Sequence, residues 1–386
     1  MSGAAGAAPP GALPPRGGLR QGQKVVLTAV VAVAVVGVGV WGGVYHFALY
    51  RADPCAGITT PSGPAGNASV RPTTSAPGAL GGTSERAGPP LPIDAPGAGG
   101  VRPAGAATDF VIQVVAWENF WGSLVSQIGG KWANVTSVIS DPNTDPHEYQ
   151  QNDSVQKAIA KAQYVILNNV GYDSQGTLDV EADQVPGQVV LNIGDSLGVS
   201  VTGGIVTGNP HLWYNPRYVN QTVAWMYDNL TAIEPALSPY FTAEYNNLTA
   251  NLTSLYSEVG VIKEKFGGTV VASTESIFVY LANASGLDLV SPSAFMEAVA
   301  EGNDPPDQSV VTFQCQLESG NVRVLVYNAQ TVTPVTSQMQ AIAVSNNVSV
   351  MSITETIVPP TDSFEQWMGG QLSDLYVHLD AHQLGE

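Results

Sequence analysis

The chain has 386 residues and a formal net charge of −18. Residues 1–108 contain seven basic and three acidic residues, whereas residues 109–386 contain seven basic and 29 acidic residues. The second part lacks the basic surface that binding to phosphate backbones requires, which excludes nucleic acid as a partner. It is also long enough to form two lobes with separate cores.

The N-terminal region contains a run that is long and apolar enough to cross a bilayer. It extends from Val25 to Val44, carries no charge and follows three basic residues. We therefore predict a cytoplasmic tail over residues 1–24 and a single-pass membrane anchor over residues 25–47, with everything that follows outside the cell. A cleaved signal peptide is the alternative, although the apolar run and the basic segment before it are long for one.

Residues 48–108 are rich in Pro, Gly and Ala and contain few bulky apolar side chains, which predicts a disordered tether. The chain has two cysteines, Cys55 in this tether and Cys315 in the acidic part. They could pair in an oxidising compartment, and the sequence leaves open whether they do.

Residues 109–215 have the pattern of an α/β lobe. Apolar runs predict strands over 110–116, 135–139 and 164–168, and helical spacing predicts helices over 119–128 and from a cap at Asp153 or Ser154 to Ala162. Alternating strands and helices predict a parallel sheet, whose ligands lie where loops leave the carboxyl ends of strands.

Residues 216–266 have apolar positions every three or four residues, which predicts a long linking helix region that Pro235 and Pro239 interrupt. A second α/β pattern follows over residues 267–386. Its predicted strands are 269–272, 322–328 and 348–353, and its predicted helices are 277–284, 335–343 and 364–379. The fold class is therefore α/β, with two lobes on either side of a long helical segment.

Four residues are candidate metal ligands. His147 and His211 each follow a proline directly, so each is presented from a stiff turn rather than a flexible loop. Glu275 and Glu355 each follow a predicted strand, where ligands collect in parallel sheets. Taken singly, each residue has an ordinary alternative, as a surface or core histidine, a helix N-terminal acid or a solvated loop acid.

Two further histidines, His378 and His382, lie four residues apart on the C-terminal helical pattern. That spacing can bind a metal on one helix face, but no third ligand lies nearby in the sequence. We therefore interpret the pair as part of a solvated C-terminal segment.

Four segments together resemble the metal-binding solute-binding proteins of zinc and manganese ABC importers. They are Asn119-Phe120-Trp121-Gly122, Asp145-Pro146-His147-Glu148-Tyr149, Val165-Ile166-Leu167-Asn168-Asn169-Val170-Gly171-Tyr172 and Pro210-His211-Leu212-Trp213. The resemblance extends from about residue 110 to the C-terminus. It implies two Rossmann-like α/β lobes joined by a long backbone helix, with an ion bound between the lobes and passed to an ABC permease, and it implies no enzymatic activity.

Carried over by position, the resemblance implies that His147, His211, Glu275 and Glu355 bind manganese or zinc. Carboxylates suit harder ions such as manganese, whereas imidazole suits zinc. Residues 148–210 lack the histidine-rich loop common in zinc importers, which favours manganese modestly. The chain departs from the family pattern in having Glu355 where manganese proteins usually have Asp.

The second ligand motif departs from the family as well. Asn209 and Asn215 stand where family members often carry Asp. A surface or adhesive protein that kept the fold but lost transport is therefore an alternative. A metallohydrolase with Glu148 as its acid or base is a weaker one, because the chain contains no His-Glu-x-x-His motif.

Overall fold

The computed structural model describes Cys55 and residues 110–142, 149, 152–199, 201–202, 205–206 and 208–381. All of these belong to a unit that spans Ala52–Glu386. The predicted anchor over residues 25–47 and the tail before it lie outside the described residues, as does the tether apart from Cys55. No helix in the described part of the chain has the length and apolar character needed to span a bilayer.

The first lobe is built on a four-stranded parallel sheet in the order β2-β1-β3-β4. Its strands are β1 (Ile112–Glu118), β2 (Ala133–Ile139), β3 (Tyr164–Leu167) and β4 (Val189–Asn192). Its helices are α1 (Asn119–Gly129), η1 (Gly130–Trp132), α2 (Asp153–Ile159), α3 (Ser174–Asp183) and α4 (Ile193–Leu197). β3 is apolar along its length, and β1 is apolar apart from Gln113 and Glu118, because helices cover both faces of the sheet.

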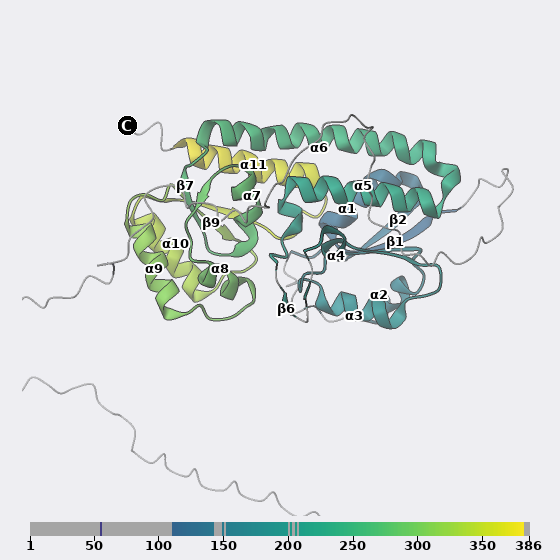
Figure 1. Cartoon of the computed structure of the whole chain (residues 1–386), viewed down its shortest axis with the longest axis horizontal. Helices are drawn as coiled ribbons and strands as arrows, with labels where there is room; N and C mark the ends of the chain where they lie inside the picture. The colour runs from purple at the N-terminus through teal and green to yellow at the C-terminus, as the bar shows by residue number, and fades with distance from the viewer. Residues whose placement is uncertain are drawn as a thin grey trace, which may run out of the picture. The chain divides into compact units, whose positions relative to one another are not determined.

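Figure 1 shows α2 and α3 on the opposite side of this sheet from α1 and the next helix, α5 (Pro216–Ile233). Two short strands, β5 (Val201–Thr202) and β6 (Ile205–Val206), pair antiparallel after α4. The turn η2 (Leu212–Tyr214) then leads into α5.

The second lobe repeats the strand order of the first, with a parallel sheet β10-β9-β7-β8. Its strands are β7 (Val270–Ser273), β8 (Asp288–Leu289), β9 (Val324–Asn328) and β10 (Ser349–Ile353). Its helices are η4 (Ser276–Phe278), α7 (Val279–Ala284), α8 (Ser293–Ala300), α9 (Asp307–Glu318), α10 (Pro334–Ser345) and α11 (Phe364–Asp380). Two parallel α/β sheets of the same topology confirm the predicted fold class at this level.

A long helix joins the lobes. After α5, the turn η3 (Pro235–Leu237) separates it from α6 (Ser238–Phe266), so the prolines break the helical region as predicted. α6 packs against α1 of the first lobe and α11 of the second, and Figure 1 shows it running past both. One apolar cluster continues from β1 through α5 and α6 to α11, so the two lobes share a core on this side.

The bounds predicted for the helix α2 were wrong at both ends. The cap of α2 is Asn152, whose side chain accepts hydrogen bonds from the backbone of Ser154 and Val155, rather than Asp153 or Ser154. Asparagine is among the most favourable N-cap residues, and its position one residue earlier starts the helix at Asp153. The helix also ends at Ile159, before the predicted end at Ala162.

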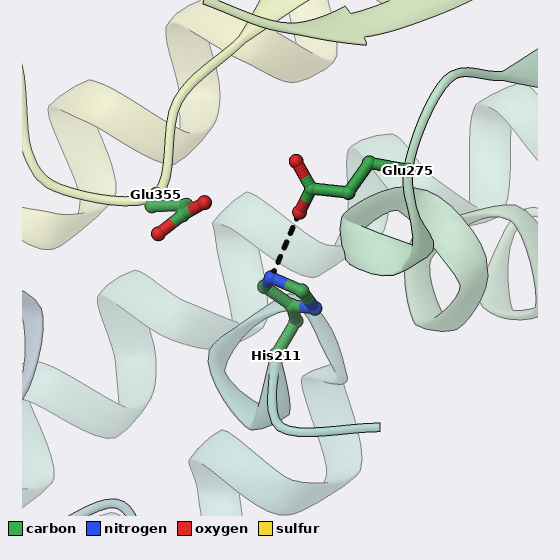
Figure 2. Close-up of side chains that lie close together, drawn as sticks. All are labelled: His211, Glu275 and Glu355. Carbon is green, nitrogen blue, oxygen red and sulfur yellow. Dashed lines mark ion pairs between the residues drawn. The ribbon is translucent and has the colours of Figure 1, made fainter. Parts of the chain in front are cut away.

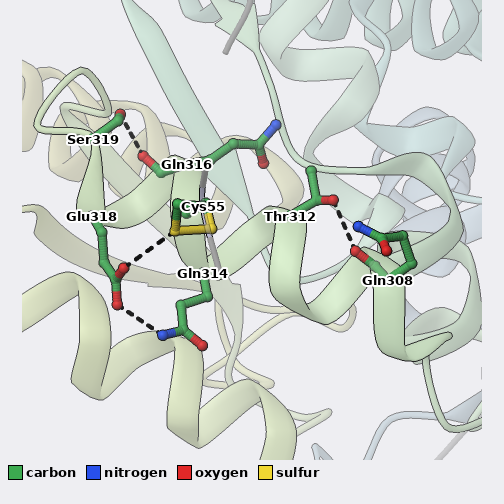
Figure 3. The surroundings of a disulfide bond; sticks show 8 residues. Cys55, Gln308, Thr312, Gln314, Gln316, Glu318 and Ser319 are labelled. Atoms are coloured by element: carbon green, nitrogen blue, oxygen red, sulfur yellow. Dashed lines mark hydrogen bonds between the residues drawn. A yellow bond between two sulfur atoms is a disulfide. The ribbon is translucent and has the colours of Figure 1, made fainter. Parts of the chain in front are cut away.

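A disulfide joins Cys55 to Cys315 of α9, with the two Cα atoms 5.4 Å apart. Figure 3 shows it beside Gln314 and Glu318 of the same helix, where Gln314 Nε2 donates to Glu318 Oε1 at 2.8 Å. The pairing that the sequence left open is therefore formed in this structure. It attaches residue 55 covalently to the second lobe.

Candidate metal centre

Three of the four predicted ligands lie together. His211, Glu275 and Glu355 each place one donor atom within 4.8 Å of the others, and they are 0%, 1% and 4% exposed. Figure 2 shows the three side chains converging, with an ion pair of 3.2 Å between His211 Nε2 and Glu275 Oε1. The fourth predicted ligand, His147, lies outside the described residues.

The two carboxylates come from the carboxyl ends of strands in the second lobe, as the general rule for parallel sheets predicts. Glu275 follows β7, and its backbone carbonyl accepts a hydrogen bond of 2.7 Å from Ser273 Oγ. Glu355 follows β10, and its backbone N–H donates to Gln330 Oε1 at 2.7 Å. The backbone of each acid is therefore held by a hydrogen bond, from the same loop for Glu275 and from the loop after β9 for Glu355.

His211 comes from the first lobe, just before η2. The next three residues, Leu212–Tyr214, are buried and fix this segment in the apolar core. The carbonyl of Pro210 accepts a hydrogen bond of 2.9 Å from Asn168 Nδ2. The histidine of one lobe thus faces the carboxylates of the other.

Asn209 determines which ring nitrogen of His211 faces the carboxylates. Its Oδ1 accepts from the His211 backbone N–H at 3.0 Å and lies 2.7 Å from His211 Nδ1. Because an amide oxygen can only accept, Nδ1 carries hydrogen, which directs Nε2 toward Glu275. An imidazole nitrogen and a carboxylate oxygen at 3.2 Å require a proton or a metal cation between them.

Two polar side chains hold the carboxylates. Asn328, the last residue of β9, donates from Nδ2 to Glu275 Oε2 at 2.8 Å and to Glu355 Oε1. Tyr172 of the first lobe donates from its hydroxyl to Glu355 Oε2 at 2.9 Å. Burial and the negative charge of Glu355 raise the pKa of Tyr172 well above its ordinary value, so it stays a protonated donor.

The turn that carries Tyr172 has an unusual backbone. Asn169 and Val170 have φ angles of 62° and 59°, and for a β-branched residue such as Val170 this left-handed conformation is strained. Asp173 holds the turn by accepting from the backbone N–H groups of Asn168 at 2.8 Å and Asn169 at 2.6 Å. Strain of this kind collects at functional sites, where the surrounding structure enforces it.

A second pair of acids, Glu118 at the end of β1 and Asp173, lies next to this turn and is 0% and 1% exposed. Burial, reinforced by the charge of Asp173, raises the pKa of Glu118 well above its ordinary value. Burial also raises the pKa of Asp173 to about 6. Two buried carboxyl groups in contact share a proton more readily than both ionise.

A cavity of about 650 Å³ lies next to the candidate site. Asn209 and Ser276, which both lie within hydrogen-bonding distance of His211, are part of its wall. Glu297 of α8 and Glu301, just after it, are in the wall as well, so two acidic side chains line the cavity.

Sequence reasoning missed the supporting residues of this site. Asn328 ends a strand that was predicted, so the strand-end rule could have singled it out. His378, interpreted as solvated, is instead half-buried, with Nδ1 2.6 Å from Ser349 Oγ of β10. His382 lies outside the described residues.

Comparison with known proteins places the chain in a family. The family model described as the zinc-uptake complex component A, periplasmic, or ZnuA, matches residues 114–377. The chain belongs to the ZnuA family. The resemblance predicted from the ligand motifs is thus confirmed. No curated protein sequence matches the chain.

Solved structures of low sequence identity share this ZnuA-family fold. TroA of Treponema pallidum, described as a periplasmic zinc-binding protein, is 13% identical, with a TM-score of 0.59 over 70% of this chain and 98% of its own. The solute-binding protein FpvC of Pseudomonas aeruginosa, in complex with Mn²⁺, is 20% identical, with a TM-score of 0.57 over 71% and 100%.

A third similar structure is the laminin-binding protein Lmb of Streptococcus agalactiae, described as bifunctional, with adhesin and metal-transporting activity. It is 15% identical, with a TM-score of 0.58 over 70% of this chain and 100% of its own. At these identities the likeness establishes the fold alone.

Proposed function

We propose that this ZnuA-family protein is a membrane-tethered solute-binding protein that captures a divalent transition-metal ion outside the cell and delivers it to an ABC permease. The observation that carries the proposal is the convergence of His211, Glu275 and Glu355, buried and contributed by both lobes. The ion is cargo, and the protein performs no chemistry on it.

The donor set fits a divalent transition metal. Two ionised carboxylates neutralise the charge of the ion, which makes its burial less costly than that of a net charge. Imidazole and carboxylate together bind zinc and manganese, and zinc has the higher intrinsic affinity for most such sites. We propose His147 as the fourth ligand. The family resemblance implies this role, and His147 follows a proline directly, as His211 does.

We further propose that residues 25–47 anchor the protein in the membrane and that the folded region lies outside. The acidic charge of residues 109–386 suits a protein that collects cations. A tether would keep the loaded protein near its permease and raise its effective concentration there.

The proposal is tested by metal content. The full chain, purified in detergent and dialysed against equal free zinc and manganese, is analysed by plasma mass spectrometry beside His147→Ala and His211→Ala. We expect one equivalent of metal in the wild type and its loss in both variants.

His378→Ala is the matched control, since this histidine is in contact with Ser349 on another part of the second lobe. It should keep its metal. Wild-type protein without bound metal, or metal that survives both ligand substitutions, would refute the proposed transport function.

A further inference from the structure

The amide of Asn328 stands between the two candidate carboxylate ligands. In the sheet order β10-β9-β7, strand β9 is central, and Asn328 is its last residue. Glu275 follows the neighbouring strand on one side and Glu355 follows the neighbour on the other. Asn328 is 1% exposed, so its amide groups are satisfied inside the protein.

The orientation of this amide is fixed by its neighbours. Asn328 Oδ1 accepts a hydrogen bond of 2.9 Å from the backbone N–H of Gln330, and a backbone N–H can only donate. The NH₂ group must therefore point the other way, toward the acids. It has two hydrogens and three acceptors within reach, namely Glu275 Oε2, Glu355 Oε1 and, at 3.0 Å, Thr331 Oγ1. Hydrogen bonds to ionised carboxylates are stronger than those to a neutral hydroxyl, so the two hydrogens go to the acids.

One oxygen of each carboxylate is thus held by the same amide. The other oxygen of Glu275, Oε1, is the one that lies 3.2 Å from His211 Nε2. The other oxygen of Glu355, Oε2, faces the first lobe, where it accepts the hydrogen bond from Tyr172. A carboxylate coordinates through both oxygens only if both turn toward the ion, and the amide opposes that rotation in both acids at once.

We propose that Asn328 is a specificity-determining residue that restricts Glu275 and Glu355 to coordination through one oxygen each. This inference rests on the proposed metal-binding function and adds a choice of ion to it. Zinc in protein sites is typically four-coordinate and tetrahedral, whereas manganese favours six oxygen-rich positions. Two carboxylates that coordinate through one oxygen each, together with imidazole, give a low coordination number and favour zinc. This differs from the sequence prediction, in which the missing histidine-rich loop modestly favoured manganese.

The test compares wild-type full chain with Asn328→Ala and Asn328→Leu, in detergent, with zinc and manganese affinities measured by competition against a chromogenic chelator. Neither variant can donate to the acids, and leucine keeps the approximate size of the side chain without adding a charge. We expect zinc affinity to fall about 10- to 100-fold, as for other residues that orient metal ligands. Manganese affinity should stay within about twofold of wild type, so the preference for zinc narrows by at least about fivefold.

A cobalt spectrum separates this role from simple structural damage. Four-coordinate Co²⁺ absorbs visible light much more strongly than six-coordinate Co²⁺. The wild type loaded with Co²⁺ should therefore give an intense visible band, and the variants a weaker one. Asn321→Ala, an exposed residue before β9, is the matched control and should leave both the affinities and the band unchanged.

The outcomes are distinguishable. Wild-type protein that binds no metal refutes the proposed function itself. Wild-type protein that binds metal but gives a weak cobalt band, or variants that keep the wild-type ratio of zinc to manganese affinity, overturn the role of Asn328 alone. Far-UV circular dichroism identifies a variant that fails to fold, and the other variant then decides the question.

Discussion

Two asparagines flank the second ligand motif, and the structure gives them different tasks. Asn209 accepts from both the backbone and the ring of His211, and its Nδ2 donates to the carbonyl of Ser276 at 2.6 Å. Replacing it by alanine removes the acceptor that fixes the imidazole. Residues that orient a metal-bound histidine typically contribute 10- to 100-fold in affinity. We therefore expect Asn209→Ala to weaken zinc binding by about 1.4–2.7 kcal/mol.

Asn215 is the matched control six positions along the same motif. Its side chain caps α5 by accepting from the backbone N–H groups of Arg217 at 3.0 Å and Tyr218 at 3.4 Å. Loss of such a cap costs about 1 kcal/mol of folding stability. Asn215→Ala should accordingly lower the melting temperature by about 2–4 °C, while the affinity for metal stays within about twofold of wild type.

The assay is zinc affinity by chelator competition together with thermal unfolding of the metal-free protein. Asn209→Ala also loses a bond between the lobes, so its melting temperature should fall as well. The variants are distinguished by the loss of zinc affinity relative to the fall in melting temperature, which should be larger for Asn209→Ala than for Asn215→Ala. Equal losses of affinity in both variants, or full affinity in Asn209→Ala, would refute the assignment of Asn209 as the residue that orients His211.

Three further predictions concern the surroundings of the site. Tyr172→Phe removes one hydrogen bond from Glu355 and should weaken metal binding by about 1 kcal/mol, roughly fivefold, as measured by the same competition assay. Burial raises the pKa of Glu118, so the folded protein favours the protonated form, and its stability is lost as pH rises above the ordinary pKa of 4.5. Glu118→Gln should remove this loss. The melting temperature of the variant should therefore exceed that of wild type increasingly toward pH 8. A protease site inserted within residues 56–109 should give fragments that stay joined on a non-reducing gel and separate after reduction, whereas Cys315→Ser should give separate fragments in both cases.

The alternation of strands and helices could be predicted because of how parallel sheets are covered. Strands buried on both faces form continuous apolar runs, as in β3 and β9, and these stand out against the spacing of the helices between them. Several other elements were missed, β8 and α3 among them. β8 has only two residues, and the helix α3 lacks a strong apolar stripe, so neither leaves a clear periodic signal.

The candidate ligands could be predicted for a related reason. Glu275 and Glu355 stand directly after apolar strands, and the topology brings the carboxyl ends of those strands to one edge of the sheet. The residues that hold these ligands could be predicted only in part. Asn328 ends a predicted strand, so its position could have been singled out, but not the two acids to which its amide donates. Tyr172 acts through a partner far away in the sequence, and no local pattern marks a tyrosine as the neighbour of a particular acid.

The hydrogen bonds that hold the candidate ligands also join the lobes, so the proposed ion site is linked to the arrangement of the whole domain. Tyr172 of the first lobe bonds to Glu355 of the second, and Asn209 bonds to Ser276 across the same boundary. Asn119 of α1 adds a pair of bonds to the backbone of Ile357, one in each direction. An ion bound between His211 and the acids, as we propose, would strengthen contacts that already exist, since the shared core along α6 holds the lobes together without it. Under the proposed function, release of the ion would require the hydrogen bonds around Glu355 to rearrange, so the residues proposed to set the affinity are also those that a permease would have to disturb.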